Sequence, residues 1–261
     1  MIGMGNSLEG RRPPAPGWAE LARTPRALFL DIDGTLVEFE SHPDLVRATQ
    51  GLIVLLKGVA DALDGALALL SGRSLTDIDR VFSPWQPHAA GVHGAEVRGP
   101  GGERRHSPKP EVLEALRSGA AELAESLPGV WVEDKGMSIA LHHRKAPGIT
   151  DELAKEAQRL AEDTGGAFEV QPGILVQELR PADFDKGLAL AEIMGEAPFA
   201  GRSPIVVGDD RTDEFAFAAA QGLGGLAILV GDRADSHAQL RLADPAAVRS
   251  WLAELIEEVR P

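Results

Sequence analysis

Short apolar segments that end in polar residues recur along the chain. The first covers residues 27–30, is too short for a helix, and leads into a pair of aspartates. Runs of similar character cover residues 66–70, 204–208 and 226–230. A short apolar run bounded by turn residues is typical of a fully buried strand. We therefore predict a parallel sheet whose strands carry polar residues at their carboxyl ends.

Amphipathic segments alternate with these runs. Apolar residues at helical spacing, with capping residues at the segment starts, predict helices between the strands. The predicted helices cover residues 43–62, a stretch from Ser74 with Asp77 as its capping acid, 185–194, a stretch ending at Ala220, and the segment that follows Asp244. Residues 97–98 and 103–105 are expected to form a hairpin. This alternation predicts a doubly wound α/β core in two parts, 25–106 and 182–261.

Between residues 107 and 181 the pattern changes. It indicates two helices and four alternating strand segments, in the order helix 113–127, strands 130–133 and 138–142, helix 153–160, and strands 168–170 and 174–179. Residues 171–173 (Gln-Pro-Gly) are predicted as the last turn. This order is typical of an α+β unit with an antiparallel sheet, so we expect an inserted cap at 107–181. Residues 1–24 are polar and proline-rich, and we expect them to be loosely ordered.

Composition limits the function. The chain has 261 residues and a formal net charge of −14 at pH 7. It contains no cysteine, which excludes disulfides and thiolate metal sites and fits a reducing cytoplasm, although it is also compatible with export. The first twenty residues lack the apolar stretch of a signal peptide, and no run approaches the length of a membrane span. Since nucleic-acid-binding proteins more often have a basic face, we expect a cytoplasmic protein that binds neither nucleic acid nor membrane.

Polar motifs follow three of the predicted strands. They are Asp31-Ile32-Asp33-Gly34-Thr35, Ser71-Gly72-Arg73 and Asp209-Asp210-Arg211-Thr212-Asp213-Glu214, and a predicted helix begins at Asp185-Lys186. Aspartate and glycine are also common in turns, so the first motif alone leaves an ordinary turn open. Carboxylates, a hydroxyl and a lysine together at the carboxyl edge of a sheet suit Mg²⁺ and phosphate chemistry.

These motifs, in this order and with an insertion before Lys186, resemble the trehalose-6-phosphate phosphatase family of the haloacid dehalogenase superfamily. The most specific stretches are residues 91–96 (GVHGAE), 133–137 (EDKGM), 178–181 (ELRP) and 208–214 (GDDRTDE). The resemblance runs from residue 28 to the C-terminus. It implies a Rossmann-like core with an α+β cap, and Mg²⁺-dependent hydrolysis of trehalose 6-phosphate to trehalose and phosphate through an aspartyl-phosphate.

The resemblance implies a role for four core side chains. Asp31 would be the nucleophile, because covalent catalysis divides one difficult displacement into two easier ones. Asp33 would protonate the leaving sugar oxygen and then activate the hydrolytic water. Ser71 would hydrogen-bond a phosphoryl oxygen, and Lys186 would neutralise the nucleophile and the phosphoryl group.

The resemblance also implies a metal site at the same edge. Mg²⁺ would be held by Asp31, the backbone carbonyl of Asp33 and Asp209, with water and phosphate completing its coordination. Asp213 would support these ligands without itself binding the metal, with Asp210 nearby.

The sugar would be recognised mainly by the cap. By resemblance, Glu133, Lys135 and Glu178 contact the glucose units, and Gly72, Arg73 and His93 are further candidate contacts from the core. On the residues alone, Glu133 and Glu178 could equally be surface charges of strands, and His93 could be structural. His142-His143 resembles a metal pair, but neighbours in a strand face opposite ways, so we interpret it as structural.

One position departs from the expected pattern. Many relatives are expected to carry a lysine after the cap glycine, whereas here Gly173 is followed by Ile174. If that lysine contacts substrate, affinity or sugar choice would differ in this chain. The core catalytic residues show no departure. The segments that join core and cap, 105–107 and 181–183, are the expected hinges of cap closure.

Alternative functions share the same core. A related phosphatase could act on sucrose phosphate or a glucosylglycerate-type phosphate, and a phosphotransferase or mutase would pass the aspartyl-phosphate to another sugar. A non-catalytic phospho-acceptor or sugar-binding module would also use clustered aspartates, but it would need neither the second acid nor a cap. We expect a small sugar phosphate as the binding partner, a monomer, and a trehalose-phosphate synthase as the candidate partner in the same pathway.

Overall fold

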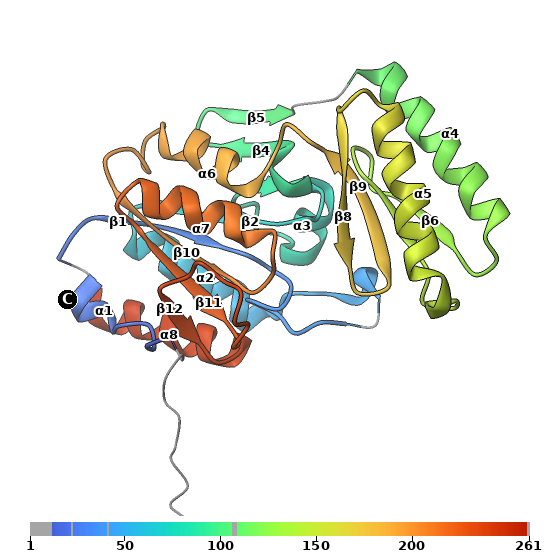
Figure 1. Cartoon of the computed structure of the whole chain (residues 1–261). Coiled ribbons are helices and arrows are strands. Elements are labelled where there is room, and N and C mark those ends of the chain that lie inside the picture. The colour runs from blue at the N-terminus through green and yellow to red at the C-terminus, as the bar shows by residue number, and fades with distance from the viewer. Residues whose placement is uncertain (1–11, 22, 41, 106–108, 260–261) are drawn as a thin grey trace, which may run out of the picture.

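The computed structural model describes residues 12–21, 23–40, 42–105 and 109–259 (Figure 1). In this part of the chain, the larger sheet has eight strands in the order β12-β11-β10-β1-β2-β3-β4-β5. The strands are β1 (Arg26–Leu30), β2 (Leu67–Leu70), β3 (His88–Gly91), β4 (Glu96–Gly99), β5 (Gly102–Arg105), β10 (Ser203–Gly208), β11 (Leu226–Val230) and β12 (Leu240–Leu242). Strands β12 to β3 are parallel, whereas β4 and β5 continue the sheet in antiparallel pairs.

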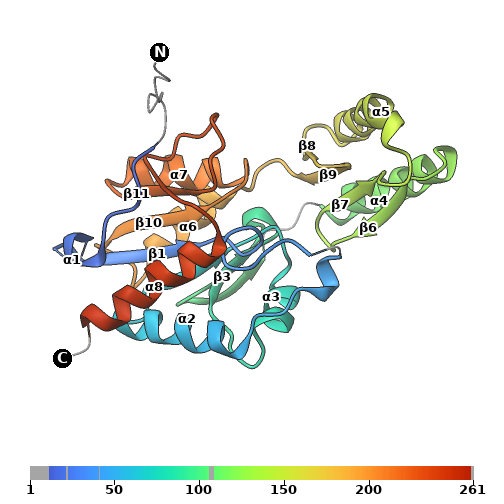
Figure 2. The same cartoon turned by 90° about the horizontal axis from the view of Figure 1, so that it is seen from below.

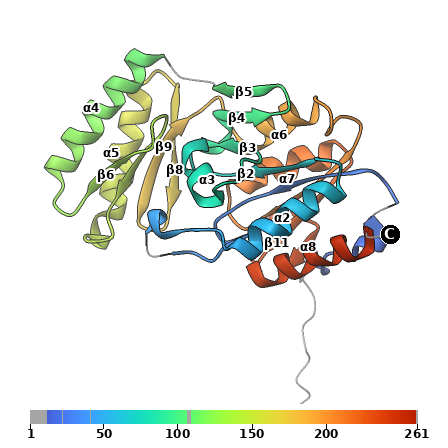
Figure 3. The ribbon, with the colours of Figure 1, turned by 180° about the vertical axis from the view of Figure 1, so that it is seen from behind.

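Helices cover both faces of this sheet. They are α2 (Gln50–Ala62), α3 (Leu75–Phe82), α6 (Lys186–Met194), α7 (Asp213–Gly222) and α8 (Pro245–Val259). Helices α2 and α8 lie side by side on one face, as Figure 3 shows, and α6 and α7 lie together on the other (Figure 2). Central strands such as β1 and β10 are apolar and almost entirely buried, as expected of a parallel sheet between two helix layers. The predicted doubly wound α/β fold is confirmed.

The insertion forms a second, smaller sheet. Its four strands lie in the order β6-β7-β9-β8 and all pair antiparallel. Its elements are α4 (Pro110–Ser126), β6 (Trp131–Asp134), β7 (Ile139–His142), α5 (Thr150–Asp163), β8 (Phe168–Gly173) and β9 (Val176–Pro181). Helices α4 and α5 pack on its outer face around a separate apolar cluster that includes Leu116, Leu153 and Leu179. Its other face looks toward the larger sheet (Figure 1). We call residues 109–181 the cap.

The N-terminal segment differs from expectation where it is described. Residues 18–21 form the short helix α1 (Trp18–Leu21), and the side chains of Trp18 and Leu21 are buried. The Trp18 ring packs against Trp251 of α8, and its indole N–H donates to the Trp251 carbonyl at 2.8 Å. The prediction of loose order is therefore wrong for this stretch, because two apolar side chains anchor an otherwise polar segment. Residues 1–11 lie outside the described residues.

Two predicted boundaries also shift. The helix expected over 43–62 is interrupted: a single 3₁₀ turn covers Pro43–Leu45, and α2 begins only after Thr49, whose hydroxyl caps Leu52 N–H. Residues 171–173 belong to β8, and the hairpin turns at Ile174 and Leu175, where Leu175 has φ 57°. Strand β12 and helix α1 carry too few residues for a periodic signal. No helix among the described residues is long and apolar enough to cross a membrane.

Candidate active site

The parallel strands bring the polar motifs to one edge of the larger sheet. Asp31 follows β1, Ser71 follows β2 and Asp209 follows β10. Because β1 pairs with both β2 and β10, these three loops are neighbours. Lys186 is the first residue of α6, which Asp185 caps by accepting the Leu188 N–H. The arrangement expected from the strand ends is therefore present.

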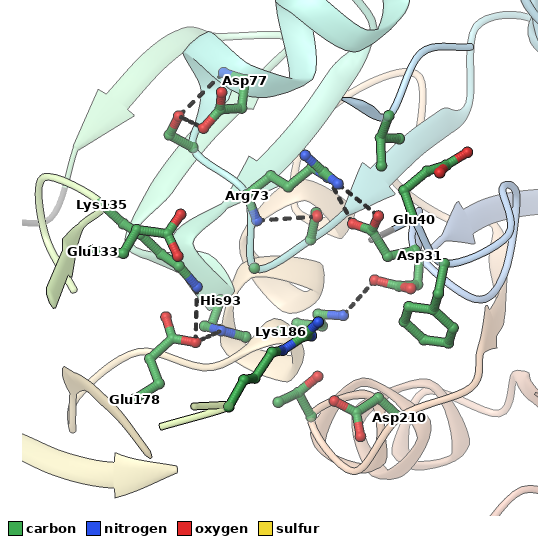
Figure 4. Close-up of a pocket in the computed structure, with 18 residues that line it drawn as sticks. Asp31, Glu40, Arg73, Asp77, His93, Glu133, Lys135, Glu178, Lys186 and Asp210 are labelled. Carbon is green, nitrogen blue, oxygen red and sulfur yellow. Dashed lines mark hydrogen bonds and ion pairs between the residues drawn. The ribbon is translucent and has the colours of Figure 1, made fainter. Parts of the chain in front are cut away.

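Lys186 is fixed between two aspartates. Its ammonium donates to Asp31 Oδ1 and to Asp213 Oδ1, each at 2.7 Å (Asp31 and Lys186 are labelled in Figure 4). All three side chains are buried. Burial opposes the charge of the ammonium, but Asp213 and Asp31 outweigh burial and raise the pKa of Lys186 well above its ordinary value. A permanent positive charge therefore adjoins Asp31.

Asp31 and two neighbouring carboxylates could together hold a metal ion. Ligand atoms of Asp31, Asp209 and Asp213 lie within 4.8 Å of one another. Asp213 has both oxygens engaged, since Oδ1 accepts from Lys186 and Oδ2 accepts from the backbone N–H of Asp209 and of Asp210, each at 3.0 Å. Asp31 and Asp209 are thus the carboxylates better placed to bind a cation, and their oxygens suit a hard divalent ion.

Burial and mutual repulsion disfavour the simultaneous ionisation of every carboxylate in this acidic cluster. Burial is the largest cause that raises the pKa of Asp209, to about 7, and the charge of Asp213 adds to it. Burial, with Asp213 and Asp209 adding to it, also raises the pKa of Asp31, although Lys186 works against this rise. A bound cation would relieve this repulsion. The close packing also explains Gly34, which has φ 81° and where a Cβ would lie 2.3 Å from Asp209 Oδ2.

Asp33 is held by Arg73 through two hydrogen bonds. Arg73 Nε donates to Asp33 Oδ2 at 2.6 Å, and Nη2 donates to Asp33 Oδ1 at 2.7 Å (Figure 4). Burial disfavours the Arg73 charge, but Asp33 more than offsets it, so the pKa of Arg73 is raised. Arg73 lines the cavity, as expected of a substrate contact, yet its guanidinium is engaged with Asp33.

A strained segment supports the loop that carries Ser71 and Arg73. Val92 and His93 adopt positive φ values of 47° and 55°, which is unfavourable for a β-branched residue such as Val92. Their N–H groups donate to the carbonyls of Arg73 (2.9 Å) and Ser71 (3.0 Å). The His93 ring packs against Gly72, where a Cβ would lie 2.8 Å from the ring. Gly72 therefore provides room for His93.

The cap contributes a second charged group. Lys135 Nζ donates to Glu178 Oε2 at 3.0 Å, and the Ser138 hydroxyl donates to Glu178 Oε1 at 2.8 Å. From the core, His93 Nε2 lies 3.7 Å from Glu178 Oε2. Burial would raise the pKa of Glu178, but Lys135 and its other partners hold it far below the usual range. Burial likewise opposes the charge of Lys135, but Glu178 and Glu133 raise its pKa.

Core and cap side chains line one cavity of about 290 Å³. The predicted site residues that line it are Asp31, Asp33, Ser71, Gly72, Arg73, His93, Glu133, Lys135, Glu178, Lys186 and Asp210. Asp209 and Asp213 lie beside Asp31 without lining the cavity. Ile174 is 88% exposed at the hairpin tip and does not line it either.

Two residues that line the cavity, Phe39 and Arg144, were not predicted from the sequence. Phe39 lies in the loop after β1 and is 73% exposed, and Arg144 lies in the loop after β7. Arg144 forms no hydrogen bond or ion pair with any residue that the structure describes. Neither residue carries a periodic or motif signal, because each reaches the cavity only through the path of its loop.

The chain matches the family model of trehalose-phosphatase over residues 29–246. The chain belongs to this family. The trehalose-6-phosphate phosphatase of Escherichia coli (strain K12) is 41% identical over 229 residues, which cover 87% of this chain and 85% of that protein. A probable trehalose-phosphate phosphatase of Sinorhizobium fredii is 42% identical over 205 residues, covering 78% and 77%.

Solved structures agree with this membership. The crystal structure of a trehalose-6-phosphate phosphatase related protein has a TM-score of 0.72 and 27% identity, and the match covers 89% of this chain and 97% of that one. The C-terminal domain of the Candida albicans trehalose-6-phosphate phosphatase has a TM-score of 0.78 at 21% identity, covering 95% and 100%, and supports the fold. The family expected from the sequence motifs is confirmed.

Proposed function

We propose that this protein hydrolyses trehalose 6-phosphate to trehalose and phosphate. The observation that carries the proposal is the shared cavity, in which Asp31 and Lys186 of the core face Glu133, Lys135 and Glu178 of the cap (Figure 4). One wall offers a carboxylate beside a fixed positive charge, as phosphoryl transfer requires. The opposite wall offers acceptors and a donor for sugar hydroxyls. Family membership supports the same substrate.

The first half of the reaction transfers the phosphoryl group to Asp31. A carboxylate oxygen of Asp31 attacks phosphorus, and the bond between phosphorus and the sugar oxygen breaks. Asp33 donates a proton to that oxygen, so trehalose leaves as a neutral alcohol. The Lys186 ammonium, 2.7 Å from Asp31, offsets negative charge on the phosphoryl oxygens. Ser71 Oγ accepts the Arg73 N–H at 3.1 Å, which leaves its own hydrogen available for a phosphoryl oxygen.

The second half regenerates the enzyme. Asp33, now ionised, takes a proton from a water molecule that attacks the phosphorus of the aspartyl-phosphate. The bond between phosphorus and Asp31 breaks, phosphate leaves, and Asp33 is again protonated. Arg73 orients the ionised Asp33 carboxylate, the base of this second half, through its two hydrogen bonds.

Mg²⁺ is the cation that we assign to the acidic cluster. Asp31, Asp209 and the backbone carbonyl of Asp33 would hold it, and Asp213 would position the loop through the N–H groups of Asp209 and Asp210. When bound, the ion would withdraw negative charge from the phosphoryl group.

The cap would read the disaccharide. Glu133, Lys135 and Glu178 offer two carboxylates and an ammonium within the cavity, and we add Arg144 as a cation that is free to bind a hydroxyl. Gly72, Arg73 and His93 are the candidate contacts from the core. The two hydrophobic clusters favour a core and a cap as separate domains, for which we predict a core of 25–106 and 182–261 and a cap of 107–181; the core cluster also includes Trp18 and Leu21, ahead of that predicted start. Closure about residues 181–183 would exclude bulk water; of the other predicted hinge, residues 106 and 107 lie outside the described residues.

A substrate panel tests this proposal. Phosphate release is measured with Mg²⁺ from trehalose 6-phosphate, sucrose 6-phosphate, glucose 6-phosphate and p-nitrophenyl phosphate. We expect a strong preference for trehalose 6-phosphate, loss of turnover on chelation with EDTA, and recovery with Mg²⁺. Asp31→Asn should remain folded and inactive on every substrate. Activity on the other sugar phosphates alone would retain the chemistry but refute the sugar assignment. Localisation in the cytoplasm, a monomeric state and a synthase partner remain predictions.

A further inference from the structure

Three side chains, those of Trp131, Glu133 and His142, lie together on the cavity-facing side of the cap sheet. Of these, only Glu133 has a role in the proposed reaction. In the register of β6 and β7, Trp131 lies opposite His142, and Glu133 lies opposite Ala140. Because side chains alternate across a strand, Trp131, Glu133 and His142 share one face of the sheet. Ala140 also pairs with Glu178 of β9, so its small side chain separates the two acids that line the cavity.

The three side chains are in contact. His142 Nε2 lies 2.8 Å from Glu133 Oε2, and since a carboxylate only accepts, this nitrogen carries the hydrogen. The His142 ring stacks on the Trp131 ring with centroids 4.0 Å apart and planes 10° apart. The His142 side chain is 13% exposed and the Glu133 side chain 29%. The imidazole is thus confined in its plane by Trp131 and directed at Glu133.

We propose that His142 is a positioning residue: it holds Glu133 Oε2, so that Oε1 faces the sugar, and Trp131 fixes the plane of the imidazole. The inference rests on the proposed function, since it deepens the role of Glu133 in reading the sugar. A glutamate side chain has three rotatable bonds, and ordering it at the moment of binding would weaken affinity. The hydrogen bond from His142 is also the largest cause of the lowered pKa of Glu133, which keeps this acceptor ionised.

A pair of variants separates this role from packing. His142→Phe keeps a ring for Trp131 to stack on but removes the N–H donor, whereas His142→Gln restores a donor of similar reach. We expect His142→Phe to lower kcat/KM for trehalose 6-phosphate about tenfold, mainly through KM, because a charged hydrogen bond is lost. The loss for p-nitrophenyl phosphate, which lacks the sugar, should be at least several times smaller. His142→Gln should recover most of the loss.

A double-mutant cycle tests whether His142 acts through Glu133. If it does, His142→Phe should cost almost nothing further in the Glu133→Ala background. Arg159→Ala is the matched control in the cap, because this side chain is 71% exposed on α5 and does not line the cavity. Thermal unfolding of each variant verifies that it is folded. If His142→Phe does not fold, His142→Asn takes its place, because its amide is too short to reach Glu133.

The outcomes are distinct. Additive losses in the cycle, equal losses on both substrates, or no recovery with His142→Gln would overturn the inference. If the wild-type protein hydrolyses a different sugar phosphate, the proposed function fails, but the same cycle with that substrate still tests His142. Calorimetric binding of the product trehalose adds a readout without turnover, in which His142→Phe should weaken binding and His142→Gln should restore it.

Discussion

The planar guanidinium of Arg73 binds both carboxylate oxygens of Asp33. Nε donates to Oδ2 at 2.6 Å, and Nη2 donates to Oδ1 at 2.7 Å. The two residues are 40 positions apart and follow adjacent strands, β1 and β2. This geometry depends on the planar guanidinium, which a lysine cannot reproduce. The orientation of the proposed acid and base thus depends on one arginine.

Arg73→Lys should therefore affect protonation of the leaving group more than phosphoryl transfer itself. We expect kcat for trehalose 6-phosphate to fall by about 10- to 100-fold, because a misplaced Asp33 protonates the alkoxide poorly. p-Nitrophenolate leaves without a proton, so the rate of the first step with p-nitrophenyl phosphate should fall much less. Steady-state and burst kinetics on both substrates measure the difference. Arg98→Lys is a matched control, because Arg98 forms a similar fork on Asp79 away from the cavity. Equal losses in the burst rate, which reports the first step, on the two substrates would contradict this role of Arg73.

Gly34→Ala should disrupt the acidic cluster. Its φ of 81° disfavours any other residue, and the new Cβ would lie 2.3 Å from Asp209 Oδ2, which must move. Gly201→Ala is the control, because Gly201 has φ 77° and open space around a Cβ. Both variants should lose about 1–2 kcal/mol of unfolding free energy through backbone strain. Only Gly34→Ala should also lose turnover and require more Mg²⁺ for half-maximal activity. If the Mg²⁺ titration is identical in the two variants, Gly34 does not support the metal site.

The positions of Asp31, Ser71 and Asp209 could be predicted from the sequence for a topological reason. The carboxyl ends of parallel strands meet at one edge, so a motif after each strand is enough to place its residues together. The cap could be recognised from its change of pattern, and its acids from the family resemblance. These inferences need only the order of elements and which strand each motif follows.

Contacts that depend on the direction of a side chain could not be predicted from the sequence. Nothing in the strand pattern indicates that Arg73 turns toward Asp33, or that Arg144 reaches the cavity from its loop. The turn at Ile174 and Leu175 also escaped prediction, because the Gln-Pro-Gly signal before it belongs to the end of β8. In each case tertiary packing outweighs a local preference.

Trp18→Ala should destabilise the core without altering the chemistry. Trp18 is 1% exposed, packs on Trp251 and donates a hydrogen bond to its carbonyl at 2.8 Å. Removing a buried aromatic side chain costs about 3–5 kcal/mol, which chemical denaturation would measure. The kcat at a temperature where the variant remains folded should match the wild type. A negligible change in unfolding free energy would show that this segment is not anchored in solution.

Glu178→Gln should change how stability depends on pH. The pKa of Glu178 is lowered in the folded protein, where Lys135 and its hydrogen bonds overcome the effect of burial. A carboxyl with a lowered folded-state pKa contributes stability that is complete above its unfolded pKa of about 4.3 and is lost as the pH falls below it. The stability difference between the wild type and Glu178→Gln should therefore be largest near pH 7 and shrink toward pH 3. Urea denaturation at several pH values measures it, and a difference that stays constant over this range would mean that the Lys135–Glu178 pair does not favour the ionised form.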